Sequence, residues 1–75
     1  MPKFWAAYPH PAGVFQARMA EKEIAGETRD EVLKTARSQC PLDRYLSSIW
    51  TVGTNRMIWE AGSGWTEAVD EFLPR

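Results

Sequence analysis

The most restrictive feature of the sequence is the segment 28–40, whose pattern predicts an amphipathic helix. Thr28 and Glu31 have the spacing of a capping box, in which the hydroxyl and the carboxylate each accept a hydrogen bond from a backbone N–H of the first turn. Pro41 ends the helix because it lacks a backbone N–H. Apolar residues recur at helical spacing and form one stripe: Val32, Leu33, Ala36 and Cys40. The rest of the chain therefore has to provide an apolar surface for this stripe.

The residues after the helix predict an antiparallel hairpin. Segments 45–52 and 56–61 are rich in aromatic and β-branched residues, which favour strands. Residues 53–55 predict the turn between them, because glycine and asparagine tolerate positive φ. Trp50 and Trp59 lie at symmetric positions about this turn, so we expect them to be near cross-strand neighbours.

The N-terminal part of the chain is less regular. Residues 4–8 predict a short strand, and residues 9–13 predict a loop because two prolines interrupt regular pairing. In residues 14–24, alternating apolar and polar side chains favour a strand, whereas a run of helix formers favours a helix. We choose the strand, because the next helix begins shortly after Gly26 and its apolar stripe needs a sheet to cover.

The C-terminal segment 65–73 has two interpretations. A short helix is suggested by apolar residues at helical spacing, namely Trp65, Ala68, Val69, Phe72 and Leu73, and a further strand through Trp65 is the alternative. Together, these patterns predict the α+β class in a single domain, residues 1–75. We expect a small, mostly antiparallel sheet with one amphipathic helix, 28–40, packed on one face.

The composition favours contact over chemistry. Four tryptophans accompany a single histidine and a single cysteine. One cysteine cannot form an internal disulfide, and the sequence has no Cys/His pair of the kind that binds zinc, so we expect neither a metal nor another cofactor. His10 lies between two prolines without a motif-linked nucleophile, and we interpret it as a surface turn residue rather than a catalytic base. Because aromatic side chains dominate protein interfaces, we predict a binding protein with Trp5 or Trp65 substantially exposed.

Charge and hydropathy limit the partners. Nine Lys/Arg against ten Asp/Glu give a net charge of −1, which is a poor basis for binding phosphate backbones, so direct nucleic-acid binding is the less favoured class. No apolar run approaches the roughly 20 residues of a membrane helix. We therefore expect a cytoplasmic protein that does not enter a membrane.

A basic edge at the end of the helix is the candidate partner-binding site. Lys34 and Arg37 lie opposite the apolar stripe, and Gln39 and Arg44 follow them. Such an edge can bind phosphates or an acidic protein, although an ordinary solvated helix face would look the same. Trp65 is the aromatic contact that we assign to the same interface.

Part of the sequence resembles small phage-encoded anti-CRISPR proteins that inhibit type I complexes. The likeness covers about half the chain: Ser38-Gln39-Cys40 after an amphipathic helix, Thr51-Val52 and Trp59 in a hairpin, and the closing Gly64-Trp65. It implies a non-enzymatic inhibitor that occupies the nucleic-acid-binding surface of a bacterial nucleoprotein complex inside the host cell. Arg37 and Gln39 match the polar and basic positions that such proteins use. The alternative is a small nucleic-acid-binding module with a basic edge and exposed aromatics.

Overall fold

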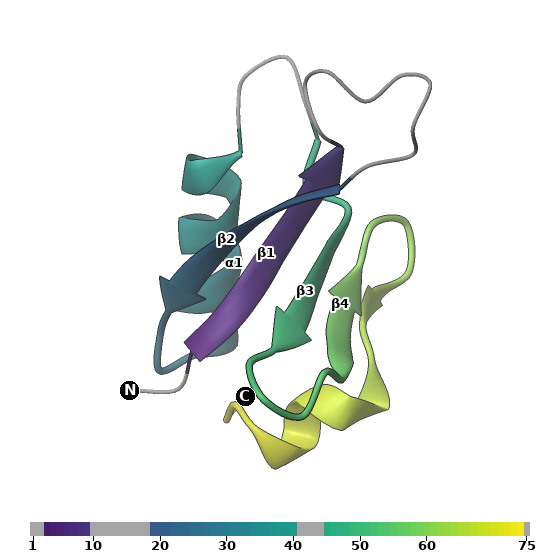
Figure 1. Ribbon diagram of the computed structural model, residues 1–75. Helices are drawn as coiled ribbons and strands as arrows, with labels where there is room; N and C mark the ends of the chain where they lie inside the picture. The colour runs from purple at the N-terminus through teal and green to yellow at the C-terminus, as the bar shows by residue number, and fades with distance from the viewer. Residues whose placement is uncertain (1–2, 10–18, 41–44, 75) are drawn as a thin grey trace.

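Five antiparallel strands form one sheet in the order β2-β1-β3-β4-β5 in the computed structural model, which describes residues 3–9, 19–40 and 45–74 (Figure 1). The elements follow the order β1 (Lys3–Pro9), β2 (Met19–Ala25), α1 (Arg29–Gln39), β3 (Ser48–Thr51), β4 (Met57–Glu60), β5 (Gly64–Trp65) and the 3-10 helix η1 (Glu67–Glu71). The predicted α+β class is confirmed.

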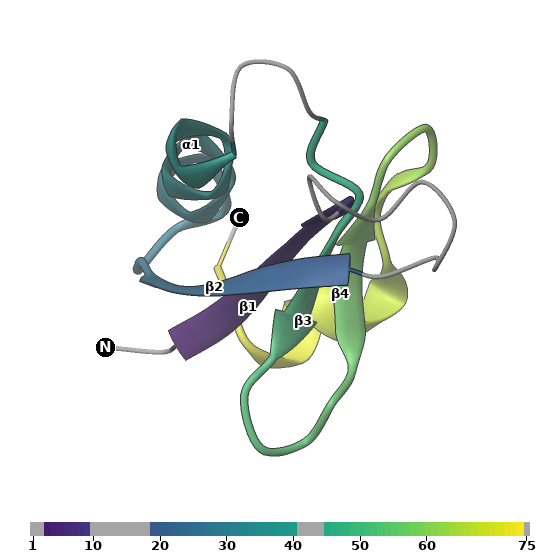
Figure 2. The same cartoon turned by 45° about the horizontal axis from the view of Figure 1, so that its top comes forward.

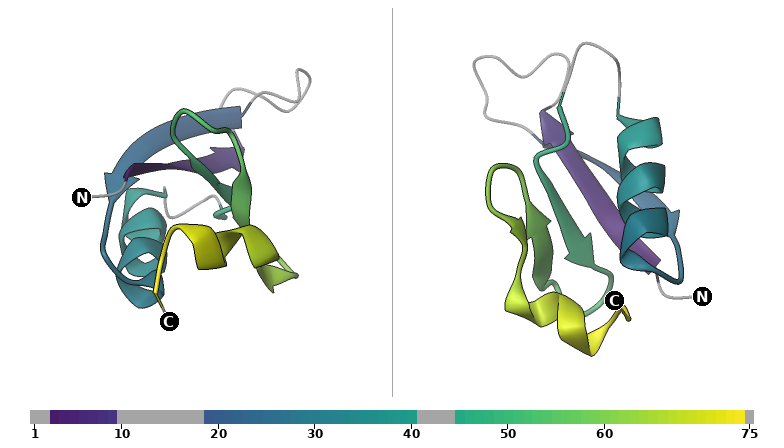
Figure 3. Two further views of the ribbon diagram at one scale, coloured as in Figure 1. Left: turned by 90° about the horizontal axis from the view of Figure 1, so that it is seen from below. Right: turned by 180° about the vertical axis from the view of Figure 1, so that it is seen from behind.

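Both helices lie on the same side of the sheet. Figure 3 shows α1 beside β1 and β2, and η1 beside β3 and β4 on that same side. In Figure 1, β1 and β2 pass in front of α1 and no described helix lies on the near side, and Figure 2 shows α1 set apart from these strands. The sheet therefore has a covered face toward the helices and an open face away from them.

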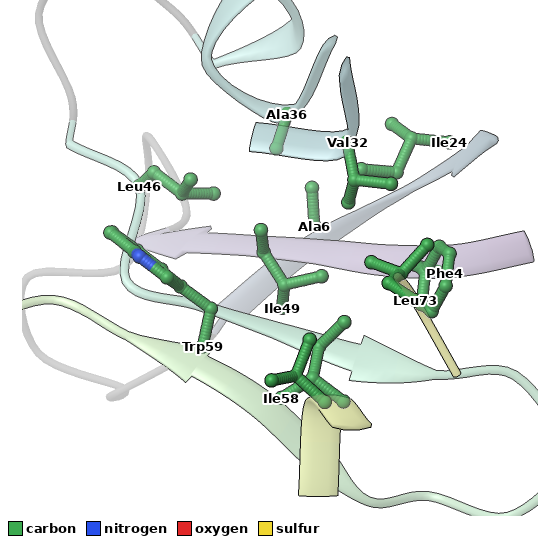
Figure 4. Packing of buried hydrophobic residues seen from close by; sticks show 11 residues of the cluster. Phe4, Ala6, Ile24, Val32, Ala36, Leu46, Ile49, Ile58, Trp59 and Leu73 are labelled. Atoms are coloured by element: carbon green, nitrogen blue, oxygen red, sulfur yellow. The ribbon is translucent and has the colours of Figure 1, made fainter. Parts of the chain in front are cut away.

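The core lies between the covered face and the helices. Alternate side chains of β1 face it, which is why Phe4 and Ala6 are buried while Trp5 between them is only half-buried. Figure 4 shows these side chains meeting those of α1 and the C-terminal segment. The buried cluster consists of Phe4, Ala6, Ile24, Val32, Ala36, Leu46, Ile49, Ile58, Trp59, Val69 and Leu73.

The predicted helix is confirmed together with its cap. Thr28 is the N-cap, and its Oγ1 accepts a hydrogen bond from the backbone N–H of Glu31 at 3.2 Å. The apolar stripe faces the core, since Val32 and Ala36 are fully buried and Leu33 packs against the same cluster. Cys40, the last residue of the stripe, is half-buried at the C-cap.

The N-terminal predictions are confirmed in part. Residues 4–8 form a strand, but the loop predicted for 9–13 is wrong at Pro9, which ends β1 opposite Met19; residues 10–13 lie outside the described part. A proline is tolerated at a strand end, where its missing N–H costs little pairing. Within 14–24, residues 19–24 belong to β2, which confirms the strand rather than the helix, and residues 14–18 are not described.

The hairpin of β3 and β4 is present but shorter than predicted, and its tryptophans do not pair. Trp59 lies opposite Ile49, and Trp50 lies opposite Met57, with a register shift between Ile49 and Trp50. The shift leaves Ile58 as the extra residue in β4, where Ile58 and Trp59 are both buried. Trp59 thus faces the core opposite Ile49, whereas Trp50 alternates with Ile49 along β3 and points to the open face.

The C-terminal segment combines the two predicted alternatives. Trp65 belongs to the short strand β5, and a single 3-10 helix, η1, follows it. Arg29 at the start of α1 forms a salt bridge with Asp70 of η1 at 2.5 Å, which links η1 to α1. Arg56 pairs with the neighbouring Glu71 at 2.8 Å.

Candidate binding surface

One row of side chains crosses the open face of the sheet from β2 to β4. Glu23 lies opposite Trp5, Trp5 opposite Trp50, and Trp50 opposite Met57. Directly opposed residues of antiparallel strands point to the same face. Two tryptophans and a methionine from three strands, here called the Trp row, are thus brought side by side.

A second row runs parallel to the Trp row, two residues further along the strands. Ala7 lies opposite Glu21 on one side and Ser48 on the other, and Ser48 lies opposite Glu60. The period of two along each strand places this row on the open face as well. Its two central residues, Ala7 and Ser48, are small and buried, and an exposed glutamate stands at each end.

A hydrogen bond joins the two rows. The Trp50 indole Nε1–H donates to Ser48 Oγ at 2.8 Å, and both residues lie on β3. The bond holds the indole along its strand, because a Trp N–H in a partly apolar setting needs an acceptor. Trp50 is therefore a positioned side chain.

The Trp row remains accessible to a partner. Trp5, Trp50 and Met57 are each half-buried, although all three belong to strands of the sheet. Aromatic residues and methionine are enriched at the buried centre of protein interfaces. A contiguous group of them on a sheet face is a feature of interaction sites, whereas singly exposed apolar residues need no explanation.

The border of the open face is acidic. Lys3 Nζ lies 3.2 Å from Glu23 Oε1, and both side chains are well exposed. Glu21 and Glu60 are exposed and make no salt bridge within the described residues. Among the described residues, the two rows thus carry three carboxylates against the one ammonium group of Lys3, which favours a cationic partner and disfavours phosphates.

The residues of the predicted site are not brought together. Lys34, Arg37 and Gln39 are exposed on α1, and Arg44 lies outside the described residues. Trp65 is in β5, opposite Trp59, where it packs against the core cluster. Because β5 and β2 form opposite edges of the sheet and α1 lies beside β2, Trp65 belongs to a different part of the molecule from the basic edge.

The expected exposure of Trp5 or Trp65 is also wrong as stated, since both are half-buried. The exposed large apolar residues in the described ranges are instead Tyr45, at 64% exposure, and Val52, at 40%. Trp50 and Met57 were not predicted to be surface residues. Alternation places Trp5 opposite in direction to Phe4 and Trp50 opposite in direction to Ile49, but only the strand register brings the two tryptophans side by side.

Three further observations bear on chemistry. His10 lies outside the described residues, and those that are described contain no group of three or more His, Cys, Asp or Glu side chains arranged to hold a metal ion. None of the described helices is long and apolar enough to cross a membrane. No family model, curated protein or solved structure matches the chain.

Proposed function

We propose that this chain is a non-enzymatic binding protein that contacts a protein partner through the open face of its sheet. The observation that carries the proposal is the Trp row: Trp5, Trp50 and Met57 form a half-exposed line on a face that no described helix covers. Large, rigid indoles bury much area at low entropic cost, and such residues supply most of the energy of protein interfaces.

The partner that we propose is a bacterial nucleoprotein complex of the CRISPR type, which the chain inhibits by stoichiometric contact in the host cytoplasm. The resemblance at residues 38–40, 51–52, 59 and 64–65 supports this form of the proposal. The exposed Lys34, Arg37 and Gln39 of α1 lie on the other side of the sheet from the Trp row, so they would make a second, separate contact. Residues outside the centre of an interface change affinity little when truncated, so the Trp row is assigned the larger share.

Direct nucleic-acid binding is the second candidate, and the exposed cations Lys34 and Arg37 favour it. The glutamates beside the Trp row work against it, because a phosphate backbone would meet like charge there. Base stacking on Trp5 and Trp50 would require the backbone to pass close to Glu21, Glu23 or Glu60.

The experiment compares two double variants in affinity capture from bacterial lysate, followed by affinity measurement on the purified partner. Trp5→Thr/Met57→Thr removes the ends of the apolar line with a residue that strands accept. Lys34→Glu/Arg37→Glu reverses the basic edge and serves as the comparison. Circular dichroism and thermal unfolding establish that both variants are folded.

We expect the open-face variant to lose about tenfold or more in affinity, as central interface residues do, and the helix variant to lose about threefold or less. Inhibition of the partner's activity should fall in the same proportion. Wild-type affinity in the open-face variant would overturn the proposal. Binding that weakens steeply with salt and depends on Arg37 would support the nucleic-acid module in its place.

A further inference from the structure

We infer that the open face receives a basic amphipathic helix of the partner, with its apolar stripe crossing the Trp row and its Lys or Arg side chains on Glu21 and Glu60. This inference rests on the proposed function and specifies the chemistry of the partner. It follows from the arrangement of charges around the apolar line and from the width of the face between them.

The spacing of the carboxylates matches the width of a helix. Glu21 on β2 and Glu60 on β4 are the ends of the second row, with Ala7 and Ser48 between them. Three strand spacings separate the two positions, or about 14 Å between their backbones. An α-helix with its side chains is about 10–12 Å across. A helix lying along β1 and β3 would therefore have one carboxylate on each side.

Such a helix would cross the Trp row, because the row runs from strand to strand. Trp5 and Trp50 belong to β1 and β3, which are the two strands beneath such a helix, and Met57 of β4 continues the line beside them. Helical residues at i, i+3, i+4 and i+7 form a stripe that contacts one surface, as in helix-in-groove recognition. The Trp50–Ser48 hydrogen bond positions one indole before the partner arrives, which reduces the entropic cost of binding.

The charge of the face selects a cationic helix. Glu21 and Glu60 make no salt bridge within the described part of the chain, and Glu60 accepts only a long hydrogen bond from Ser63 Oγ at 3.4 Å, so neither carboxylate is neutralised by a cation there. Glu23 is already paired with Lys3. Lysine or arginine that flanks an apolar stripe can reach a glutamate and also lie over an indole face, where a cation–π contact adds to the attraction.

A direct test uses two synthetic amphipathic peptides of about 18 residues, long enough to form helix on binding. One has a leucine stripe flanked by lysines, and the other has the same stripe flanked by glutamates. Binding is measured by calorimetry and by the change in tryptophan fluorescence, since two of the four tryptophans lie on the open face. A single-stranded oligonucleotide is the third probe.

The variant that tests the charges is Glu21→Lys/Glu60→Lys. Its matched control is Glu27→Lys/Glu67→Lys, which changes two other exposed glutamates, one before α1 and one at the start of η1, and alters the net charge equally. We expect the lysine peptide to bind the first variant about tenfold or more weakly than wild type, and the glutamate peptide to bind it more tightly. The control should change the affinity by about threefold or less, because its charges are off the face.

Equal losses in the two variants would overturn the inference, as would tighter binding of wild type to the glutamate peptide or to the oligonucleotide than to the lysine peptide. The same variants applied to the captured partner separate the two proposals. If Trp5→Thr/Met57→Thr abolishes capture and Glu21→Lys/Glu60→Lys does not, the binding face stands and the basic helix is wrong. If neither changes capture, the proposed function itself fails.

Discussion

Trp5 and Trp50 lie directly opposite each other on β1 and β3, on the open face of the sheet. This pairing brings two residues from distant parts of the chain together on one surface, and Met57 extends that surface to β4. Trp59, the tryptophan nearest to Trp50 along the chain, is instead buried on the other face. The same residue type thus serves the core and the candidate interface.

The cross-strand contact should be measurable as an interaction energy. In a double-mutant cycle with Trp5→Leu and Trp50→Leu, we expect a coupling of about 0.2–1 kcal/mol, as for directly opposed side chains on one sheet face. The matched cycle of Trp5 with Trp59 should give coupling near zero, because these residues point to opposite faces. Urea unfolding supplies the four free energies, and equal coupling in both cycles would contradict the register.

Gly26→Ala should destabilise the protein by about 1–3 kcal/mol, the cost of overpacking. A Cβ at this position would lie 2.8 Å from Val32 Cγ2, and Val32 is fully buried in α1. Glycine-to-alanine changes in compatible sites stabilise by about 0.4–1 kcal/mol, so the sign of the effect is diagnostic. Repeating the change in a Val32→Ala background should reduce the cost, since the nearest atom is then absent. Stabilisation by Gly26→Ala in the wild type would show that β2 and α1 are further apart.

Asp70→Asn should cost more stability than Glu71→Gln. The Arg29 side chain is only 17% exposed, and its Nε is buried without a hydrogen-bond partner among the described residues, so loss of the Asp70 charge leaves a largely buried cation. We expect about 1–2 kcal/mol, between the values for exposed and buried pairs. The Arg56–Glu71 pair is exposed at 52% and 58%, and its loss should cost about 0.5 kcal/mol or less. The free energies of unfolding of the two variants are compared by chemical denaturation at low salt. A larger loss of stability in Glu71→Gln than in Asp70→Asn would contradict the Arg29–Asp70 salt bridge.

Thr28→Ala should lower the free energy of unfolding by about 1 kcal/mol, because the N–H of Glu31 loses its acceptor at the start of α1. Thr28→Ser retains a hydroxyl and should stay close to wild type. The denaturant midpoint reports both variants. An alanine variant with an unchanged midpoint would place the start of the helix elsewhere.

The sequence by itself determined the elements whose causes are local. Thr28 and the stripe from Val32 to Ala36 predicted α1, because a cap and a period of 3.6 residues act within a few turns of backbone. Strands were likewise predicted near their observed positions at Phe4 and Ile58, since aromatic and β-branched residues favour extended backbone wherever the strand later pairs.

Tertiary structure decided which strands pair and in which register, and with them the candidate site. The register places Ile49 opposite Trp59, so Trp50 faces outward beside Trp5 although symmetry about the turn predicted a contact with Trp59. Trp65 was predicted to share an interface with the basic edge, but its strand lies at the other edge of the sheet from β2. Sequence spacing carries no information on which sheet edge a strand will join. Register and edge are set by long-range packing around Phe4, Ile49 and Val32, which only the folded chain brings together.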